Sequence, residues 1–247
     1  LSETFFLKLR KKFQFGSKAE TLSRLDGRLN ECLVPQFRHF DLACWKSNRD
    51  TVLAKISDLS DGKGTVIVRS SARDEDGELY AQAGAFLSVP HISPADGAAV
   101  ASAVEAVFAS YQRTAAVENP EDQVLVQKMV DRVSMSGVIF TQELSSGAPY
   151  YVVNYDDETG STDTVTSGTG YANRTIYIHR DHGDAVSSER FAKLIAAVRE
   201  IEKVTGESCL DIEFAIDEDY HIHLFQVRRI TAQPNWSRGL SLRIDDA

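Results

Sequence analysis

The chain has 247 residues, of which 43% are hydrophobic and 26% are charged, and its formal net charge is −9 at pH 7. This composition is typical of a globular protein with one large domain or two lobes, and it excludes a disordered chain. No apolar run approaches the ~20 residues that a membrane span requires, and the acidic balance argues against a general nucleic-acid partner. The sequence shows no signal peptide, and its three cysteines (Cys32, Cys44 and Cys209) fit no disulfide or zinc spacing, so we expect a cytoplasmic protein.

The first half of the chain favours helices. Residues 18–30 carry leucines at helical spacing behind a serine–glutamate capping box, which predicts a helix. An apolar run at residues 65–70 predicts a buried strand. The pair Ser93-Pro94 predicts the start of another helix, whose apolar face extends to Tyr111.

The second half favours strands, with one clear helix. Four strands are expected at residues 123–130, 136–141, 149–155 and 174–179. Residues 188–204 have apolar positions in helical register and Gly206 as a stop, which predicts a helix. Residues 210–217 and 221–228 predict a β-hairpin. This is an α+β pattern. We expect an N-terminal lobe at 1–122, a C-terminal lobe at 123–236, and the start of a linker or tail at 237–247.

The predicted hairpin carries the most informative side chains. Strand alternation puts Asp211 and Glu213 on one face of the first strand, and Gln226 and Arg228 on one face of the return strand. A carboxylate and an amide oxygen that converge with a guanidinium suit a divalent cation bridged to a polyphosphate. The alternative is a surface hairpin with an exposed Glu–Arg pair, worth well under about 1 kcal/mol.

Two cations and a run of small residues precede the hairpin in positions suited to phosphate. Lys18 lies in the first turn of its helix, where a bound phosphate would reverse the unfavourable effect of the macrodipole; the alternative is a solvated lysine. Arg69 lies where the apolar strand emerges, and it would meet either a phosphate or a nearby acidic side chain. The small residues around Gly84 would let backbone N–H groups approach phosphate oxygens.

Residues 124–130 form an apolar strand near the predicted junction of the lobes. Its backbone would offer an N–H and a carbonyl to an adenine edge, with Met129 and Val130 packing beside it. The alternative is an ordinary core strand.

The histidines give no functional signal of their own. The six residues are His39, His91, His179, His182, His221 and His223. They show no metal-ligand spacing, and we assign none of them a catalytic role. Strand alternation predicts that the last two lie on the face opposite Gln226 and Arg228.

The order of these segments resembles the N-terminal nucleotide-binding domain shared by phosphoenolpyruvate synthase, pyruvate phosphate dikinase and rifampin phosphotransferase. The matching segments are Gly16-Ser17-Lys18-Ala19, Leu33-Val34-Pro35, Val68-Arg69-Ser70-Ser71-Ala72 with Glu75-Asp76, Ala83-Gly84 with Phe86 and Ser88-Val89, Val126-Gln127-Lys128-Met129-Val130, Ser136-Gly137-Val138-Ile139-Phe140-Thr141, Asp211-Ile212-Glu213, and Gln226-Val227-Arg228-Arg229-Ile230-Thr231. They cover nearly the whole chain. The resemblance implies a two-lobed ATP-grasp-type fold that binds ATP between its lobes.

The resemblance also implies a role for each matching residue. Lys18 and Arg69 would hold the ATP phosphates, the loop around Gly84 would cover them, and Arg228 would meet the γ-phosphate. The residues that would line the adenine slot are Gln127, Met129 and Val130. The ligands implied for Mg²⁺ are Glu213 and Gln226. Such a set agrees with phosphoryl transfer, which depends on positioning and on neutralising phosphate charge.

The sequence departs from the family pattern in three ways. Arg229 stands where the family usually has proline, and Ala81 stands where serine is usual. The family also passes the phosphoryl group through a mobile domain with a histidine in a Gly-rich, Ser-His context, and no such segment occurs in this sequence. The chain starts at Leu1 and ends at Ala247, about where a linker to that domain would begin, so we expect the ATP-binding module of a longer enzyme.

The phosphoryl acceptor is left open by these residues. Residues 150–157 and 164–168 look similar to the branch that contains the L-glutamine kinase of capsule biosynthesis. Pyruvate or another small molecule are the other acceptors that the family implies. Two alternatives come from different classes: a nucleotide-binding regulatory module without turnover, and an interaction domain without affinity for ATP.

Overall fold

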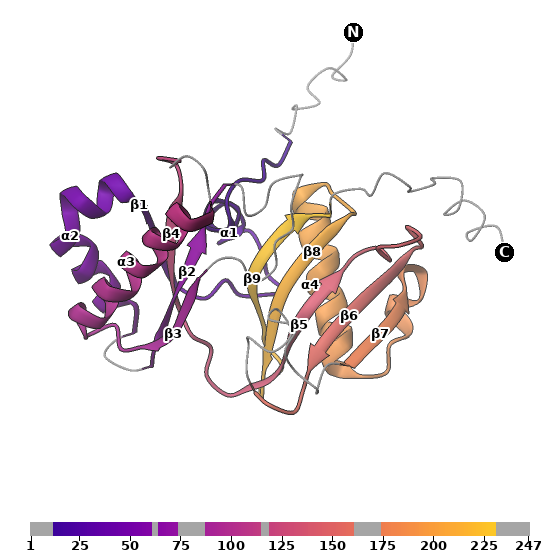
Figure 1. Cartoon of the computed structure of the whole chain (residues 1–247). Helices are drawn as coiled ribbons and strands as arrows, with labels where there is room; N and C mark the ends of the chain where they lie inside the picture. The colour runs from indigo at the N-terminus through magenta and orange to yellow at the C-terminus, as the bar shows by residue number, and fades with distance from the viewer. Residues whose placement is uncertain (1–11, 61–63, 74–86, 115–118, 161–173, 231–247) are drawn as a thin grey trace, which may run out of the picture.

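The computed structural model of this chain describes residues 12–60, 64–73, 87–114, 119–160 and 174–230. Its elements, in chain order, are α1 (Lys18–Leu25), β1 (Phe37–Asp41), α2 (Leu42–Ser57), η1 (Asp58–Ser60), β2 (Val66–Ser71), β3 (Ser88–Ile92), α3 (Gly97–Thr114), β4 (Gln123–Lys128), β5 (Val133–Phe140), β6 (Tyr150–Asp156), β7 (Arg174–His179), η3 (Arg180–Ala185), α4 (Glu189–Thr205), β8 (Leu210–Asp217) and β9 (Ile222–Arg229). None of the helices within these ranges is long and apolar enough to cross a membrane. Figure 1 shows two sheets side by side, each covered by helices.

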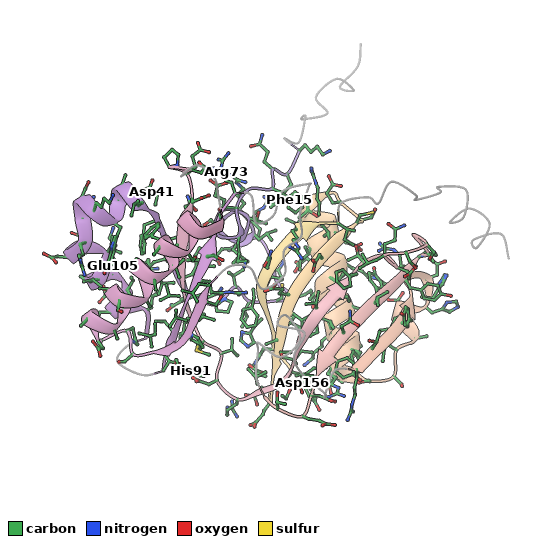
Figure 2. The ribbon with its side chains drawn as sticks, in the orientation of Figure 1. Phe15, Asp41, Arg73, His91, Glu105 and Asp156 are labelled. Carbon is green, nitrogen blue, oxygen red and sulfur yellow. The ribbon has the colours of Figure 1, made fainter. Side chains whose placement is uncertain are left out.

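The first sheet has the order β1-β4-β2-β3, with antiparallel pairing throughout, and α2 and α3 pack against it (Figure 1). Asp41, labelled in Figure 2, starts α2, because its side chain accepts the backbone N–H of Cys44 at 2.7 Å. Apolar residues of both helices and of the sheet, including Trp45 and Val104, form one buried core.

The second sheet has the order β7-β6-β5-β8-β9, also antiparallel, and α4 packs across one face. Leu194 and Ile201 of α4 pack with Phe214 of β8, and each is 1% exposed. The core also takes in α1, whose Leu22 and Leu25 are fully buried. The first helix of the chain therefore belongs to the core of the second sheet.

The predicted α+β class with two lobes is confirmed. The expected strand at 174–179 is β7, and the expected helix at 188–204 is α4, which ends at Gly206 in the left-handed conformation (φ 71°). The chain passes from the first sheet to the second between Lys128 and Val133, rather than near residue 122. The reason is that β4 pairs with both β1 and β2.

Two helix limits differ from the prediction. The first helix ends at Leu25 and not at residue 30, because Asp26 leaves the helical conformation (φ −55°, ψ 131°) and Gly27 adopts a positive φ of 71°. The helix expected from Pro94 begins at Gly97, because the carboxylate of Asp96 accepts the backbone N–H groups of the following turn at 3.0–3.1 Å.

A β-bulge corrects the prediction for the last two histidines. Glu213 pairs with Gln226, but the next pair is Phe214 with Leu224, so Phe225 is an extra residue in β9. Beyond the bulge, His223 lies opposite Ala215 and so shares a face with Gln226. The prediction that it lies on the opposite face is wrong, because strict alternation is broken at this residue.

Gly137 allows β5 and β6 to approach closely. A Cβ added there would lie 2.9 Å from the backbone Cα of Tyr155, and closer still to the carbonyl oxygen of Asn154. We expect Gly137→Ala to lower the free energy of unfolding by about 1–3 kcal/mol, measured by urea denaturation. Gly97→Ala is the matched control, since its Cβ meets only a side-chain atom at 3.9 Å. Equal stability of the two variants would contradict this close approach.

Candidate active site

An ion pair between Arg69 of β2 and Glu213 of β8 joins the two sheets. The guanidinium Nη2 donates to Oε2 at 2.8 Å, and the two side chains are only 13% and 17% exposed. Burial raises the pKa of Glu213, but the positive charges of Arg69 and Lys18 outweigh it and hold the pKa below its usual value. An ionised carboxylate is therefore fixed where the sheets meet, and Arg69 has the acidic partner that the sequence left open.

Arg228 of β9 pairs with Asp211 of β8. Its Nε and Nη2 both lie 2.6 Å from Oδ2, because the two residues are direct neighbours in the strand register. Asp211 is 6% exposed, and burial raises its pKa against the opposing effect of Arg228. The alternative of an exposed Glu–Arg pair is wrong, since the partner is an aspartate and the pair is mostly buried.

Lys18 is a buried lysine at the start of α1. It is 4% exposed, so the alternative of a solvated side chain is wrong. Its charge helps to lower the pKa of Glu213 and opposes the rise that burial causes in the pKa of Asp211, which places it in the same electrostatic neighbourhood. The backbone N–H of the next residue donates to Ser71 Oγ at 2.9 Å, and this contact ties α1 to the end of β2. The structure thus gathers a lysine and two arginines from three different elements around two carboxylates.

The residues predicted for adenine line a cavity together with the ion pair between the sheets. The residues around this cavity are Ile67, Arg69, Gln127, Lys128, Met129, Val130, Gly137, Glu213, Phe214 and Phe225. Gln127 is 1% exposed, and neither its Oε1 nor its Nε2 has a hydrogen-bond partner among the described residues. Buried amides nearly always have partners, so an unpaired amide in a cavity wall points to a ligand or a water molecule.

This cavity measures about 30 Å³, roughly the volume of one water molecule. Ligand sites usually measure about 300–1,000 Å³, so a nucleotide requires the lobes to separate or the lining to move. A larger cavity of about 720 Å³ lies on the first lobe, between α2, α3 and residues 119–122. None of the residues predicted for the site lines it, so we consider the smaller cavity as the functional candidate.

Glu213 and Gln226 are the pair suited to a hard cation. They lie directly opposite each other on β8 and β9, on the face that carries Arg228, and Gln226 is 3% exposed. Carboxylate and amide oxygens are ligands that Mg²⁺ and Ca²⁺ prefer. The cation would take the carboxylate that now pairs with Arg69.

Other predicted features lie away from this cavity or outside the described ranges. Gly84, Ala81 and residues 164–168 lie outside them. Tyr151 and Tyr155 of the tyrosine-rich strand are buried in the core of the second lobe, so they are structural. Arg229 pairs with Glu207 at 2.8 Å, outside the cavity.

The sequence missed the role of Asp211. Asp211 was placed on the correct face, but its pairing with Arg228 depends on the strand register, which the spacing of residues does not give. The sequence signal that could have indicated this pairing is the position of Asp211 itself, two residues before Glu213 and therefore on the same face of the strand.

No family model matches this sequence, and no curated protein matches it. Among solved structures, the chain is similar to the D-alanine-D-alanine ligase from Coxiella burnetii, with a TM-score of 0.49, 11% identity, and coverage of 87% of this chain and 48% of that chain. It is also similar to a RimK domain protein, described as ATP-grasp, from Sphaerobacter thermophilus, with a TM-score of 0.46, 15% identity and coverage of 94% and 64%. A third is the VanG D-Ala:D-Ser ligase from Enterococcus faecalis, with a TM-score of 0.43, 12% identity and coverage of 86% and 53%.

The chain spans about half to just under two thirds of these three proteins. One of them carries the ATP-grasp description that the sequence predicts for this chain. All TM-scores lie below 0.5 and all identities below 25%, so these likenesses support no conclusion about activity, and the resemblance to the phosphoenolpyruvate synthase family stays a prediction.

Proposed function

We propose that this chain is the ATP-binding part of an ATP-grasp-type phosphotransferase similar to phosphoenolpyruvate synthase, with Mg-ATP bound between the two lobes. The observation that supports this most is the buried, unpaired amide of Gln127. It lies in the same cavity wall as a cross-lobe arginine and a carboxylate. The same cavity thus offers an amide that can hydrogen-bond a nucleotide base and charged side chains that can bind a polyphosphate and its metal ion.

The cations would share the phosphate charge in this proposal. Lys18 and Arg69 would hold the phosphates, and Arg228, kept in position by Asp211, would neutralise the charge that develops on the transferred group. Glu213 and Gln226 would hold Mg²⁺, which supplies further charge neutralisation when bound. ATP binding would exchange the Arg69–Glu213 pair for arginine–phosphate and carboxylate–metal contacts.

The acceptor belongs to the longer enzyme in this proposal. The phosphoryl group would pass to a histidine on a swivelling domain, to a small molecule such as pyruvate, or, as in L-glutamine kinases, to a side-chain amide. A regulatory nucleotide-binding module is the alternative from another class. The buried Asp211–Arg228 pair favours catalysis, since a module without turnover needs no arginine held for the γ-phosphate.

Gln127→Leu tests the proposed site, because it should raise the stability of the nucleotide-free protein and lower the affinity for Mg-ATP. Removing a buried amide without partners is expected to stabilise the nucleotide-free protein by about 1 kcal/mol. The same change removes hydrogen bonds to the base, so the affinity for Mg-ATP should fall about tenfold or more. Wild-type protein at 100 times its dissociation constant for Mg-ATP should gain about 2.7 kcal/mol, and thermal unfolding with and without nucleotide measures both effects.

Gln142→Leu is the matched control, because the Gln142 amide is hydrogen-bonded to the Gly147 carbonyl and to Cys209 in the second lobe. We expect it to lower stability and to leave the affinity for Mg-ATP unchanged. If wild-type protein shows no stabilisation by Mg-ATP, an interaction domain is the better description. If Gln127→Leu binds as tightly as wild type, the base does not occupy this cavity.

A further inference from the structure

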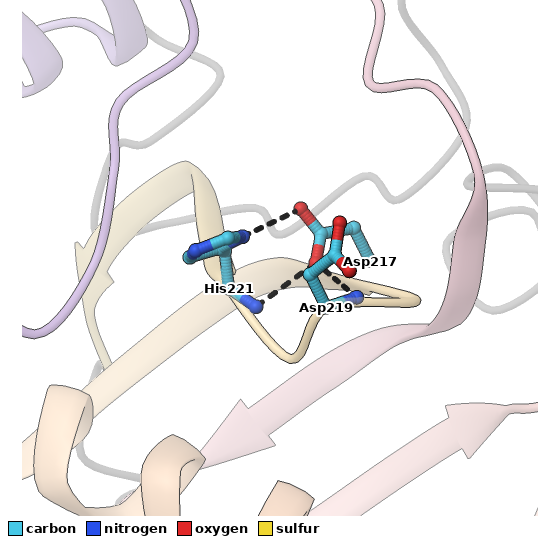
Figure 3. A group of neighbouring side chains, drawn as sticks. All are labelled: Asp217, Asp219 and His221. Atoms are coloured by element: carbon cyan, nitrogen blue, oxygen red, sulfur yellow. Dashed lines mark hydrogen bonds and ion pairs between the residues drawn. The ribbon is translucent and has the colours of Figure 1, made fainter.

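Two histidines and two aspartates lie at the turn end of the β8–β9 hairpin, and Figure 3 shows three of these residues, Asp217, Asp219 and His221. The nitrogens His221 Nδ1 and His223 Nε2 lie 3.1 and 3.0 Å from the same oxygen, Oδ2 of Asp217. The ligand atoms of Asp217, Asp219 and His221 all lie within 4.8 Å of one another. Figure 3 shows these three side chains turned toward a common point.

The separation of His221 and Asp217 fits the coordination sphere of a tetrahedral metal ion. Zinc binds nitrogen and carboxylate oxygen at about 2.0–2.2 Å, so neighbouring ligand atoms lie roughly 3.3–3.5 Å apart around it. The distance from His221 Nδ1 to Asp217 Oδ2 therefore needs to lengthen by only a few tenths of an ångström. The His221 imidazole would then present the Nδ1 lone pair to the metal and carry its proton on Nε2.

The first ligand is fixed by the backbone of the turn. Asp217 Oδ1 accepts the N–H groups of Asp219 and His221, both at 2.9 Å, so that Oδ2 is left to face the imidazoles. The carboxylate is therefore oriented by the turn itself, as metal ligands held by an outer shell of hydrogen bonds are.

The sheet holds His223 beside Asp217. The side chain of His223 is 14% exposed, and the backbone on either side of it pairs with Leu33, with hydrogen bonds of 2.8 Å from Leu33 to Ile222 and from Leu224 to Leu33. Arg132 reaches Asp219 at 2.6 Å and Glu218 at 3.3 Å. Lys193 lies over the ring of Tyr220 at 5.6 Å, so two cations face three carboxylates at the turn, and the local charge still favours a bound cation.

We propose that Asp217, Asp219 and His221 bind one divalent transition metal ion of the zinc class, with His223 beside Asp217 helping to hold that carboxylate in place. The imidazole of His221 decides the class of metal, because imidazole suits zinc, cobalt, nickel and copper, whereas Mg²⁺ and Ca²⁺ take oxygen ligands. The site is distinct from Glu213 and Gln226 and does not depend on ATP binding. A metal there would clamp the hairpin turn.

Titration of tag-free protein with Zn²⁺ by calorimetry, and with Co²⁺ by visible absorption, tests this site without nucleotide. The double variant His221→Asn with His223→Gln keeps an N–H donor where each ring nitrogen now lies, so the hydrogen bonds to Asp217 are retained and the imidazole ligand is lost. We expect one equivalent of metal in the wild type and an affinity at least about 100-fold lower in the double variant. The Co²⁺ spectrum should show the intense bands of a tetrahedral site in the wild type only.

His91→Asn is the matched control, since His91 is exposed, lies on β3, and has a positive φ of 60° that asparagine tolerates. It should bind metal as the wild type does, and so should Glu213→Gln, which removes the proposed Mg²⁺ ligand. Equal metal affinity of the wild type and the double variant would overturn the proposal. So would the absence of Zn²⁺ binding to wild-type protein that circular dichroism shows to be folded.

Discussion

Glu213→Gln is expected to abolish Mg²⁺-dependent phosphoryl transfer by the full-length enzyme, with a loss on the order of 10²–10³-fold or more. The substitution removes the only charged ligand in the proposed metal pair and keeps nearly the same volume. In this chain, Mg²⁺ should strengthen ATP binding to the wild type and should have no effect on the variant. Calorimetric titration with ATP, in Mg²⁺ and in EDTA, measures that difference.

Glu213→Gln should also change ATP binding in the absence of metal, because it removes the ion pair between Glu213 and Arg69. Glu213 now holds Arg69 across the lobes at 2.8 Å, so its loss leaves the guanidinium available to phosphate. Metal-free ATP should therefore bind the variant at least as tightly as it binds the wild type. Glu218→Gln is the matched control on the same hairpin, where the carboxylate is 60% exposed and pairs with Arg132. Unchanged turnover in Glu213→Gln would rule out the kinase hypothesis.

The sequence predicts the elements whose apolar pattern is strong. The helix α4 has Phe191, Leu194, Ile195, Val198 and Ile201 in register, and all five are buried in the core. The hairpin β8–β9 alternates cleanly, so its core face and polar face were predictable. These elements form the framework of the second lobe and place Glu213 on the face toward the first.

The elements that the sequence missed lack such a pattern. The strand β1 has one buried residue, Phe40, among five. Only Trp45, Val52 and Ile56 of α2 are buried, and Asn48 interrupts it with a non-helical conformation (φ −134°). The strand β3 contains Pro90, which argues against a strand in a sequence-based prediction.

The members of the candidate site were predictable, but their partners were not. Arg69 and Glu213 are separated by 144 positions, and only the packing of the two sheets brings them together. The bulge at Phe225 shifts the register, so alternation alone put His223 on the wrong face. The burial of Lys18 depends on α1 joining the core of the second lobe. Spacing along the chain carries none of this information.

The buried pair of Arg228 and Asp211 leads to the second large effect. Arg228→Met keeps an apolar stem and removes the charge, so the carboxylate of Asp211 loses its main partner in a site where it is 6% exposed. We expect the free energy of unfolding at pH 7 to fall by about 3–5 kcal/mol, which corresponds to a drop in Tm on the order of 10 °C. Urea denaturation and thermal unfolding measure the loss.

The loss of stability in Arg228→Met should depend on pH, and the pKa of Asp211 determines the direction of that dependence. Burial already raises this pKa above 3.8 in the folded protein, and removal of Arg228 raises it further. The folded variant then binds more protons than the unfolded chain, so its stability is highest below the unfolded pKa and declines as the pH rises through the folded pKa. The deficit relative to wild type should be small near pH 4 and largest near pH 7.

Adding Asp211→Asn to Arg228→Met separates the unpaired charge from lost packing. The double variant has no carboxylate to ionise, so it should regain most of the stability lost at pH 7 and should lose the pH dependence of the deficit. It should still lack phosphoryl transfer in the full-length enzyme, because the arginine proposed for the γ-phosphate is absent. A deficit below 1 kcal/mol in Arg228→Met, or one independent of pH, would mean that Asp211 is solvated or neutral, and the buried pair could not then hold Arg228 in position.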